Sequence, residues 1–132
     1  MLKITRWSES INELKEMCRI EGLIAHDYIP DPDHYMDHWH LRYKSCFRDK
    51  LIITVDNTII GCAYLAQGRE VNKTNLYFEL YINPHYHRKG HGTTTFKFIY
   101  KQAKDIGCKK LFTYIYDHPN WDAGKSFLEK NN

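Results

Sequence analysis

The residues best suited to chemistry lie in one stretch, residues 82–92, which read Ile-Asn-Pro-His-Tyr-His-Arg-Lys-Gly-His-Gly. Gly90 and Gly92 have no Cβ, so the backbone can approach an anion closely. Arg88 and Lys89 add two positive charges at the same place. If a helix begins here, its first N–H groups also point at the anion. The stretch predicts a pyrophosphate site, and a plain tight turn is the alternative that it leaves open.

A metal site is the second chemistry to consider, and the pattern does not favour it. His34 and His38 are four residues apart, with Asp37 and His40 nearby, but no Glu completes a His-Glu-x-x-His motif. The cysteines are widely spaced and include no Cys-x-x-Cys pair; they are Cys18, Cys46, Cys62 and Cys108. We therefore expect neither a metal nor a redox motif.

Two elements must position the glycine-bearing stretch. Before it, apolar and polar or aromatic residues alternate over residues 76–82, which predicts a strand. After it, apolar residues recur at helical spacing from residue 93 to a stop at Gly107. Ligands of open α/β sheets bind beyond the carboxyl ends of strands, where this turn falls. The turn is too short for a Walker A loop and is not Gly-x-Gly-x-x-Gly, which disfavours nucleoside triphosphates and dinucleotides.

The remaining elements give a mixed α/β (α+β) order. Asp56 and Asn57 separate two strand-like runs and predict a hairpin. Ser10 and Glu13 form a capping box for a helix that Gly22 would stop. In chain order we expect strands at residues 2–7, 51–55, 58–65, 76–82 and 110–116, and helices at residues 11–22, 35–47, 93–107 and 121–130.

Size and composition describe one globular unit, a single domain over residues 1–132. A hydrophobic fraction of 42% and a charged fraction of 27% exclude a disordered or fibrous chain. No apolar run is long enough to span a bilayer and no signal-peptide stretch opens the chain, so we expect a cytoplasmic protein without membrane contact. The net charge is only +3, with lysines gathered over residues 88–110. A solvated helix face explains them better than nucleic-acid binding, which ranks last.

With these motifs in order, the sequence resembles the GNAT superfamily of acetyl-coenzyme A-dependent N-acetyltransferases. The family signature Gln/Arg-x-x-Gly-x-Gly/Ala corresponds to residues 87–92, after an apolar-x-Pro strand end at residues 82–84. Asn120 and the helix residues 127–130 match the pattern downstream. The resemblance implies a mostly antiparallel, mixed central sheet flanked by helices.

The resemblance also implies which residues hold the cofactor, acetyl-CoA, without a metal. Backbone N–H groups would hold the pyrophosphate; the residues of this loop are His87, Arg88, Lys89, Gly90, His91, Gly92 and Thr93. The backbone of Tyr81 and Ile82 would pair with the pantetheine arm, and Asn120 would reach the same arm. His87 replaces the usual Gln or Arg, a change that a backbone-based site tolerates.

For catalysis, the resemblance points to attack of a neutral amine on the thioester, which requires proton removal and close positioning. Glu79, on the polar face of the strand, is the candidate base, directly or through a water. A carboxylate that pairs with a lysine or solvates the strand is the structural alternative. Leu128 stands where many members carry the Tyr that protonates the thiolate, so a solvent proton, Tyr116 or Tyr114 would serve instead.

The acceptor is expected to be a primary amine of a small molecule or a peptide. In the family its pocket is walled by the first two helices and their loop. That region offers Tyr28, Tyr35, Trp39 and Tyr43 together with Asp31, Asp33 and Asp37. Aromatics with carboxylates suit a cationic amine, and ordinary helix packing is the alternative.

Family members continue into a final pair of strands beyond the point that Asn132 matches. The strand pair is expected to be missing, so the chain would be truncated or would complete its sheet with a partner chain, as in a homodimer. The sequence thus predicts an N-acetyltransferase that works by direct transfer in a ternary complex. The alternative is a catalytically weak acetyl-CoA-binding sensor or interaction module.

Overall fold

A computed structural model describes residues 1–24, 29–41, 47–67 and 75–113. These residues form five strands, three α-helices and one short 3-10 helix, η1. In chain order they are β1 (Leu2–Arg6), α1 (Ile11–Ile24), α2 (Pro32–Leu41), β2 (Arg48–Val55), β3 (Thr58–Gln67), β4 (Asn75–Ile82), η1 (Pro84–Tyr86), α3 (His91–Ile106) and β5 (Lys110–Phe112).

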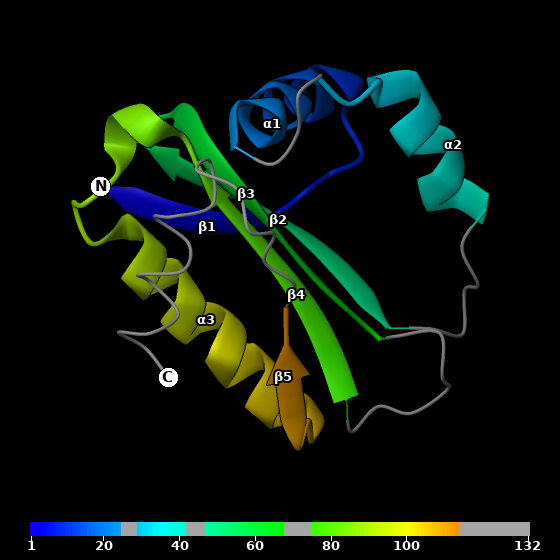
Figure 1. Cartoon of the computed structure of the whole chain (residues 1–132), viewed down its shortest axis with the longest axis vertical. Coiled ribbons are helices and arrows are strands. Elements are labelled where there is room, and N and C mark those ends of the chain that lie inside the picture. The colour runs from blue at the N-terminus through cyan, green and yellow to red at the C-terminus, as the bar shows by residue number, and fades with distance from the viewer. Residues whose placement is uncertain (25–28, 42–46, 68–74, 114–132) are drawn as a thin grey trace.

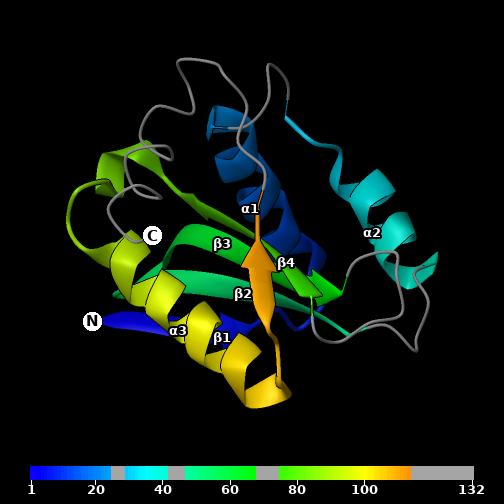
Figure 2. The ribbon, with the colours of Figure 1, turned by 60° about the horizontal axis from the view of Figure 1, so that its bottom comes forward.

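The five strands form one sheet in the order β1-β2-β3-β4-β5. Each pair among β1, β2, β3 and β4 is antiparallel. Strand β5 pairs in parallel with β4, through Asn75–Tyr77 in the described part of the chain. Helices α1 and α2 lie over one face of the sheet and α3 lies over the other (Figure 1). A second view shows β5 following α3 and lying beside β4, the strand with which it pairs (Figure 2). The mixed, mostly antiparallel sheet flanked by helices is confirmed.

The β2–β3 hairpin follows from its turn residues. Asp56 and Asn57 both have positive φ, 49° and 69°, as the two central residues of a tight hairpin turn require. The pairing shifts between Ile53 and Thr54, where β3 carries a bulge. At Gly61, next to this bulge, an added Cβ would lie 2.4 Å from the Tyr81 carbonyl oxygen on β4. Only glycine fits there without displacing the backbone.

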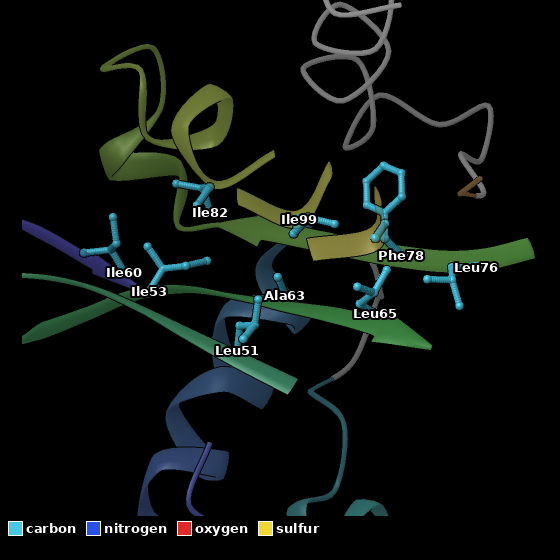
Figure 3. Close-up of a cluster of buried hydrophobic side chains, with 10 residues drawn as sticks. Leu51, Ile53, Ile60, Ala63, Leu65, Leu76, Phe78, Ile82 and Ile99 are labelled. Atoms are coloured by element: carbon cyan, nitrogen blue, oxygen red, sulfur yellow. The ribbon is translucent and has the colours of Figure 1, made fainter. Parts of the chain in front are cut away.

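The alternation along β4 divides its side chains between the two faces. Leu76 and Phe78 enter the apolar cluster between the sheet and α3, where they meet Ile99 and Ala103 of the helix (Figure 3). Burial of this apolar surface is the main term that holds α3 to the sheet. The helix is thereby fixed with its first residue at the end of the turn that leaves β4.

The other face carries a second cluster, under α1. Leu14, Met17 and Ile20 point from α1 onto the sheet and are almost completely buried. Tyr81 from β4 and Cys62 from β3 belong to the same cluster. Strand β4 thus contributes the alternate residues Leu76, Phe78 and Ile82 to one core and Tyr81 to the other.

Several element boundaries differ from the sequence expectation. Helix α1 runs through Gly22 to Ile24, because tertiary packing of its apolar face outweighs the modest cost of one glycine. Helix α2 starts at Pro32 rather than residue 35 and ends at Leu41. The Asp31 carboxylate accepts the Asp33 N–H at 3.0 Å, so Asp31 caps α2 and Pro32 occupies its first position. The predicted helix at residues 121–130 lies outside the described residues.

In the part of the chain that the structure describes, no helix has the length and apolar character needed to cross a membrane. The described cysteines, Cys18, Cys62 and Cys108, are free thiols.

Burial raises the pKa of the Cys62 thiol from 9.0 to about 12 and that of Cys18 to about 11. The thiolate is the reactive form, and only about one Cys62 thiol in ten thousand is ionised at pH 8, so Cys62 reacts slowly. We therefore expect N-ethylmaleimide to label Cys108 in the folded protein well before Cys18 or Cys62, as read by peptide mass spectrometry. Urea should make Cys18 and Cys62 as reactive as Cys108. Equal labelling of Cys18, Cys62 and Cys108 without urea would contradict this placement.

The same shifts set a pH dependence. The pKa values of Cys18 and Cys62 are both raised in the folded state. The contribution of these thiols to the free energy of unfolding is therefore complete below the ordinary pKa of 9.0, and it is lost as the pH rises through the folded values.

Candidate active site

The turn that leaves β4 is built by Asn83. Its side-chain oxygen accepts the His85 N–H at 3.1 Å, and its carbonyl accepts the Tyr86 N–H at 2.8 Å. Pro84 occupies the first position of η1, where a missing N–H costs nothing. This single 3-10 turn redirects the chain from the end of the sheet to the basic residues.

Two residues of the basic turn have left-handed backbone conformations, Arg88 with φ 61° and Gly90 with φ 83°. Glycine adopts this region freely, whereas arginine does so at a cost of about 1 kcal/mol. No described atom lies within 4 Å of the position that a Cβ would take on Gly90, so space is open beside it. Arg88, Lys89 and Gly90 are all exposed.

Helix α3 begins directly after Gly90. Its first intrahelical bond runs from the Thr94 N–H to the Gly90 carbonyl at 3.0 Å, and Gly90 has no side chain to cap the preceding N–H groups. The N–H groups of His91, Gly92 and Thr93 therefore have no acceptor within the helix, and the positive end of the helix dipole lies behind them. Together with Arg88, Lys89 and the open space at Gly90, they fit a pyrophosphate.

His87 fastens this turn to the strand. Its Nε2 lies 2.7 Å from the Ile82 carbonyl oxygen. A carbonyl only accepts, so Nε2 carries the hydrogen. The Asn83 N–H bonds to the Ile60 carbonyl on β3, which by the alternation of an antiparallel ladder directs the Ile82 carbonyl to the opposite edge of β4. His87 thus ties the turn to the edge of β4 on which β5 lies.

Glu79 stands on β4 three residues before the end of the strand and is half-buried. The Tyr81 hydroxyl donates a hydrogen bond to its Oε1 at 2.8 Å. Burial and then the charge of Glu79 raise the pKa of Tyr81, so the phenol stays protonated and remains a donor. Of the described side chains, only Tyr81 donates to Glu79, which leaves the second carboxylate oxygen for a proton or a water.

A polar row crosses the sheet from Glu79. On the neighbouring strands, Glu79 pairs with Tyr64 of β3, and Tyr64 pairs with Lys50 of β2. Directly opposed residues in an antiparallel sheet share a face, so all three lie on the side covered by α1 and α2. We call Lys50, Tyr64 and Glu79 the polar row.

Helix α2 supplies an aromatic wall beside this row. The Trp39 ring lies 6.2 Å from the Tyr64 ring and 5.3 Å from that of Trp7, and Tyr35 stacks along Trp39 at 6.5 Å. The Arg48 guanidinium lies 4.0 Å from the centre of the Trp39 ring, and the Lys50 ammonium lies 4.4 Å from that of Tyr35. The rings of Trp39 and Tyr35 are therefore each already in contact with a cation of the protein.

A pocket of about 310 Å³ opens at the Lys50 end of the polar row. Its size suits a small molecule. It lies between α2 and the adjoining ends of β1 and β2, and its lining residues are Arg6, Trp7, Glu9, Trp39, Arg48, Asp49 and Lys50.

The structure thus brings most of the described candidate residues into two groups. His87 to Thr93 form the turn and the start of α3, whereas Glu79, Tyr35 and Trp39 share the α1 and α2 face of the sheet. Tyr28, Tyr43, Tyr114, Tyr116 and Asn120, with Leu128, lie outside the described residues. Among the described side chains no group of three or more His, Cys, Asp or Glu could hold a metal ion.

Sequence reasoning missed the Tyr81 side chain and Lys50. Tyr81 had been considered for its backbone alone, although strand alternation places it on the same face as Glu79. Lys50 had been left outside the predicted strand at residues 51–55. Its alternation with Ile52 on β2 was the available signal.

A comparison with the curated protein sequences finds no match. A family model does match: that of the acetyltransferase (GNAT) family, over residues 9–128.

Solved structures share the fold at low sequence identity. YncA from Salmonella typhimurium, whose structure contains acetyl-CoA, has a TM-score of 0.75 and 15% identity, over 98% of this chain and 77% of that one. PaiA N-acetyltransferase from Thermoplasma acidophilum, in complex with coenzyme A, has a TM-score of 0.72 and 22% identity, over 100% and 89%. The aminoglycoside acetyltransferase meta-AAC0020 from an uncultured soil sample, in complex with sisomicin, has a TM-score of 0.73 and 17% identity, over 99% and 87%.

The family match covers most of the chain, and it includes both β4 with Glu79 and the basic turn before α3. The shared fold agrees with that match. This chain belongs to the acetyltransferase (GNAT) family.

Proposed function

We propose that this protein is an N-acetyltransferase that moves the acetyl group of acetyl-CoA to a primary amine of a small molecule or peptide, by direct transfer in a ternary complex. One observation carries the proposal: a carboxylate held by a tyrosine hydroxyl, Glu79 with Tyr81, lies on the strand that leads into the anion-binding turn. A base and a phosphate cradle are thereby fixed to one rigid element.

In this proposal the turn holds the co-substrate, which supplies an activated acetyl thioester when bound. The N–H groups of residues 88–93 bind the pyrophosphate, with charge added by Arg88 and Lys89. His87 holds the turn in place through the Ile82 carbonyl. The backbone of Tyr81 and Ile82 and the side chain of Asn120 orient the pantetheine arm.

Glu79 then accepts the proton of the acceptor amine, directly or through a water, so that the amine attacks in its neutral form. Tyr116 returns a proton to the sulfur. Tyr35 and Trp39 of α2 wall the acceptor side together with Tyr28. No metal takes part in this scheme.

We further propose that residues 1–132 act as a single cytoplasmic domain, and that a homodimer contact completes the sheet.

The test is calorimetric binding of acetyl-CoA to the wild-type chain and to Gly90→Glu. A carboxylate about 5 Å from a phosphate costs about 3 kcal/mol at an effective dielectric constant of 20, which is about 100-fold in Kd. We expect a loss of that size. Gly107→Glu is the matched control, because Gly107 also has a positive φ, 96°, and open space, but ends α3. No binding by the wild-type chain would remove the proposal.

A thiol-release assay separates the enzyme from the sensor alternative. The acceptor panel should include aminoglycosides such as sisomicin, since the aminoglycoside acetyltransferase with this fold was crystallised with that compound. It should also include polyamines and peptide amines. Acetyl-CoA binding without thiol release from any amine would favour the sensor.

A further inference from the structure

Lys50 is a buried cation without a directly paired carboxylate among the described residues. It is 6% exposed, and no carboxylate of the described residues lies within the 4.0 Å of an ion pair with its ammonium. Its nearest described partner is Tyr35, whose ring centre lies 4.4 Å from the ammonium and whose hydroxyl is a hydrogen-bond partner; Glu21 acts on it through its charge from beyond ion-pair distance. A cation–π contact returns only part of the cost of removing an ammonium from water.

The acids beside Lys50 already have partners. Asp49 accepts from Arg6 at 3.0 Å and from Gln102 of α3 at 2.7 Å, so it points away from Lys50 to the other face of the sheet. Glu9 accepts the Trp39 indole N–H at 2.9 Å. The pocket is lined by three cationic and two acidic residues, and both acids are occupied. The formal charges of these five residues sum to +1.

Burial alone would lower the pKa of Lys50, but the neighbouring Cys62, Tyr35 and Glu21 groups raise it, and the net direction is upward. Lys50 is therefore an ammonium at neutral pH.

Lys50 and Glu79 stand at the two ends of the polar row, with Tyr64 between them. Neighbouring strands lie about 4.8 Å apart, so the two Cα atoms are about 9.5 Å apart. If the amine of an acceptor lies at Glu79, a second group a few bonds from that amine can reach Lys50.

Resting on the proposed function, we propose that Lys50 is an anion-binding residue of the acceptor site and that the acceptor is an amine carrying a carboxylate. The carboxylate binds the Lys50 ammonium by a charge-assisted hydrogen bond, and the amine lies against Glu79. A purely cationic amine would place its charge beside Arg48 and Lys50, both of which already cover the aromatic faces.

The first test is acetylation of paired amines that differ only in the acid. The panel runs from β-alanine through 4-aminobutyrate and 5-aminovalerate to 6-aminohexanoate, each beside the alkylamine of equal length. We expect kcat/KM for the best amino acid to exceed that of its alkylamine at least tenfold. Lys50→Met should remove this ratio, Lys50→Arg should keep part of it, and Lys15→Met, an exposed lysine of α1, should leave it unchanged. Equal rates for acid and alkylamine, or a ratio that survives Lys50→Met, would overturn the inference.

The second test needs no turnover. With coenzyme A present, hexanoate should bind the wild-type protein in calorimetry, and at least tenfold more weakly to Lys50→Met and to Lys50→Gln. Removing an unpaired buried charge should leave the melting temperature unchanged or higher, which separates lost binding from lost folding. Failure of hexanoate to bind overturns the Lys50 assignment alone. Failure of acetyl-CoA to bind overturns the proposed function.

Discussion

Glu79→Gln should lower kcat by about 100-fold to 10,000-fold, the usual contribution of a positioned general base. The amide keeps the size of the side chain and still accepts a hydrogen bond from Tyr81, but it cannot take up a proton from the amine. Acetyl-CoA binding should stay within about threefold of wild type, because the phosphate-binding turn begins five residues beyond the end of β4. Steady-state thiol release and calorimetry together measure both effects.

Two variants make the Glu79 result specific. Glu16→Gln, which removes a carboxylate that pairs with Arg19 on α1, should keep wild-type turnover. Tyr81→Phe should lower kcat less than Glu79→Gln, because it removes only the hydrogen bond that orients the carboxylate and leaves the base in place. Full activity of Glu79→Gln would exclude Glu79 as the base and leave it as a strand carboxylate.

Gly61→Ala should destabilise the fold by about 3 kcal/mol, at the upper end of the range for overpacking. The new Cβ would stand 2.4 Å from the Tyr81 carbonyl oxygen and 2.9 Å from Cδ1 of Ile82. The nearer atom is backbone and cannot turn away, so β3 and β4 must separate at Tyr81 and Ile82. Urea unfolding followed by tryptophan fluorescence gives the free energy of unfolding.

Gly107→Ala is the matched control for Gly61→Ala. Gly107 has a positive φ but no described neighbour within 4 Å, so alanine there meets only backbone strain, about 1–2 kcal/mol. A Gly61→Ala variant no less stable than Gly107→Ala would show that β3 and β4 approach each other less closely than the structure has them.

Local signals were sufficient to predict the elements that flank the basic turn. Strand β4 and helix α3 show clear periods of 2 and 3.6 residues, and Asp56-Asn57 specifies its hairpin without tertiary information. The start of α2 was also readable, because Asp31 before Pro32 is a cap followed by a proline at the first helical position. The helix was placed three residues late because the prolines were interpreted as a loop.

The acceptor side could not be predicted in the same way. Lys50, Tyr64 and Glu79 come from three strands, and only the register of the sheet aligns them. A charged residue at the start of an apolar run, such as Lys50, is locally indistinguishable from a strand boundary. That Arg48 and Lys50 cover Trp39 and Tyr35 depends on how α2 packs, which no local pattern encodes.

The division of β4 between two faces has a consequence for how such a protein can change. The apolar cluster toward α3 contains Leu76, Phe78 and Ile99, whereas the polar row faces α1 and α2. Substitutions in the row therefore leave the α3 core intact, and the basic turn before α3 stays anchored while the polar row changes. If the proposed function holds, the acceptor side of the sheet can therefore change without loss of the packing that fixes α3.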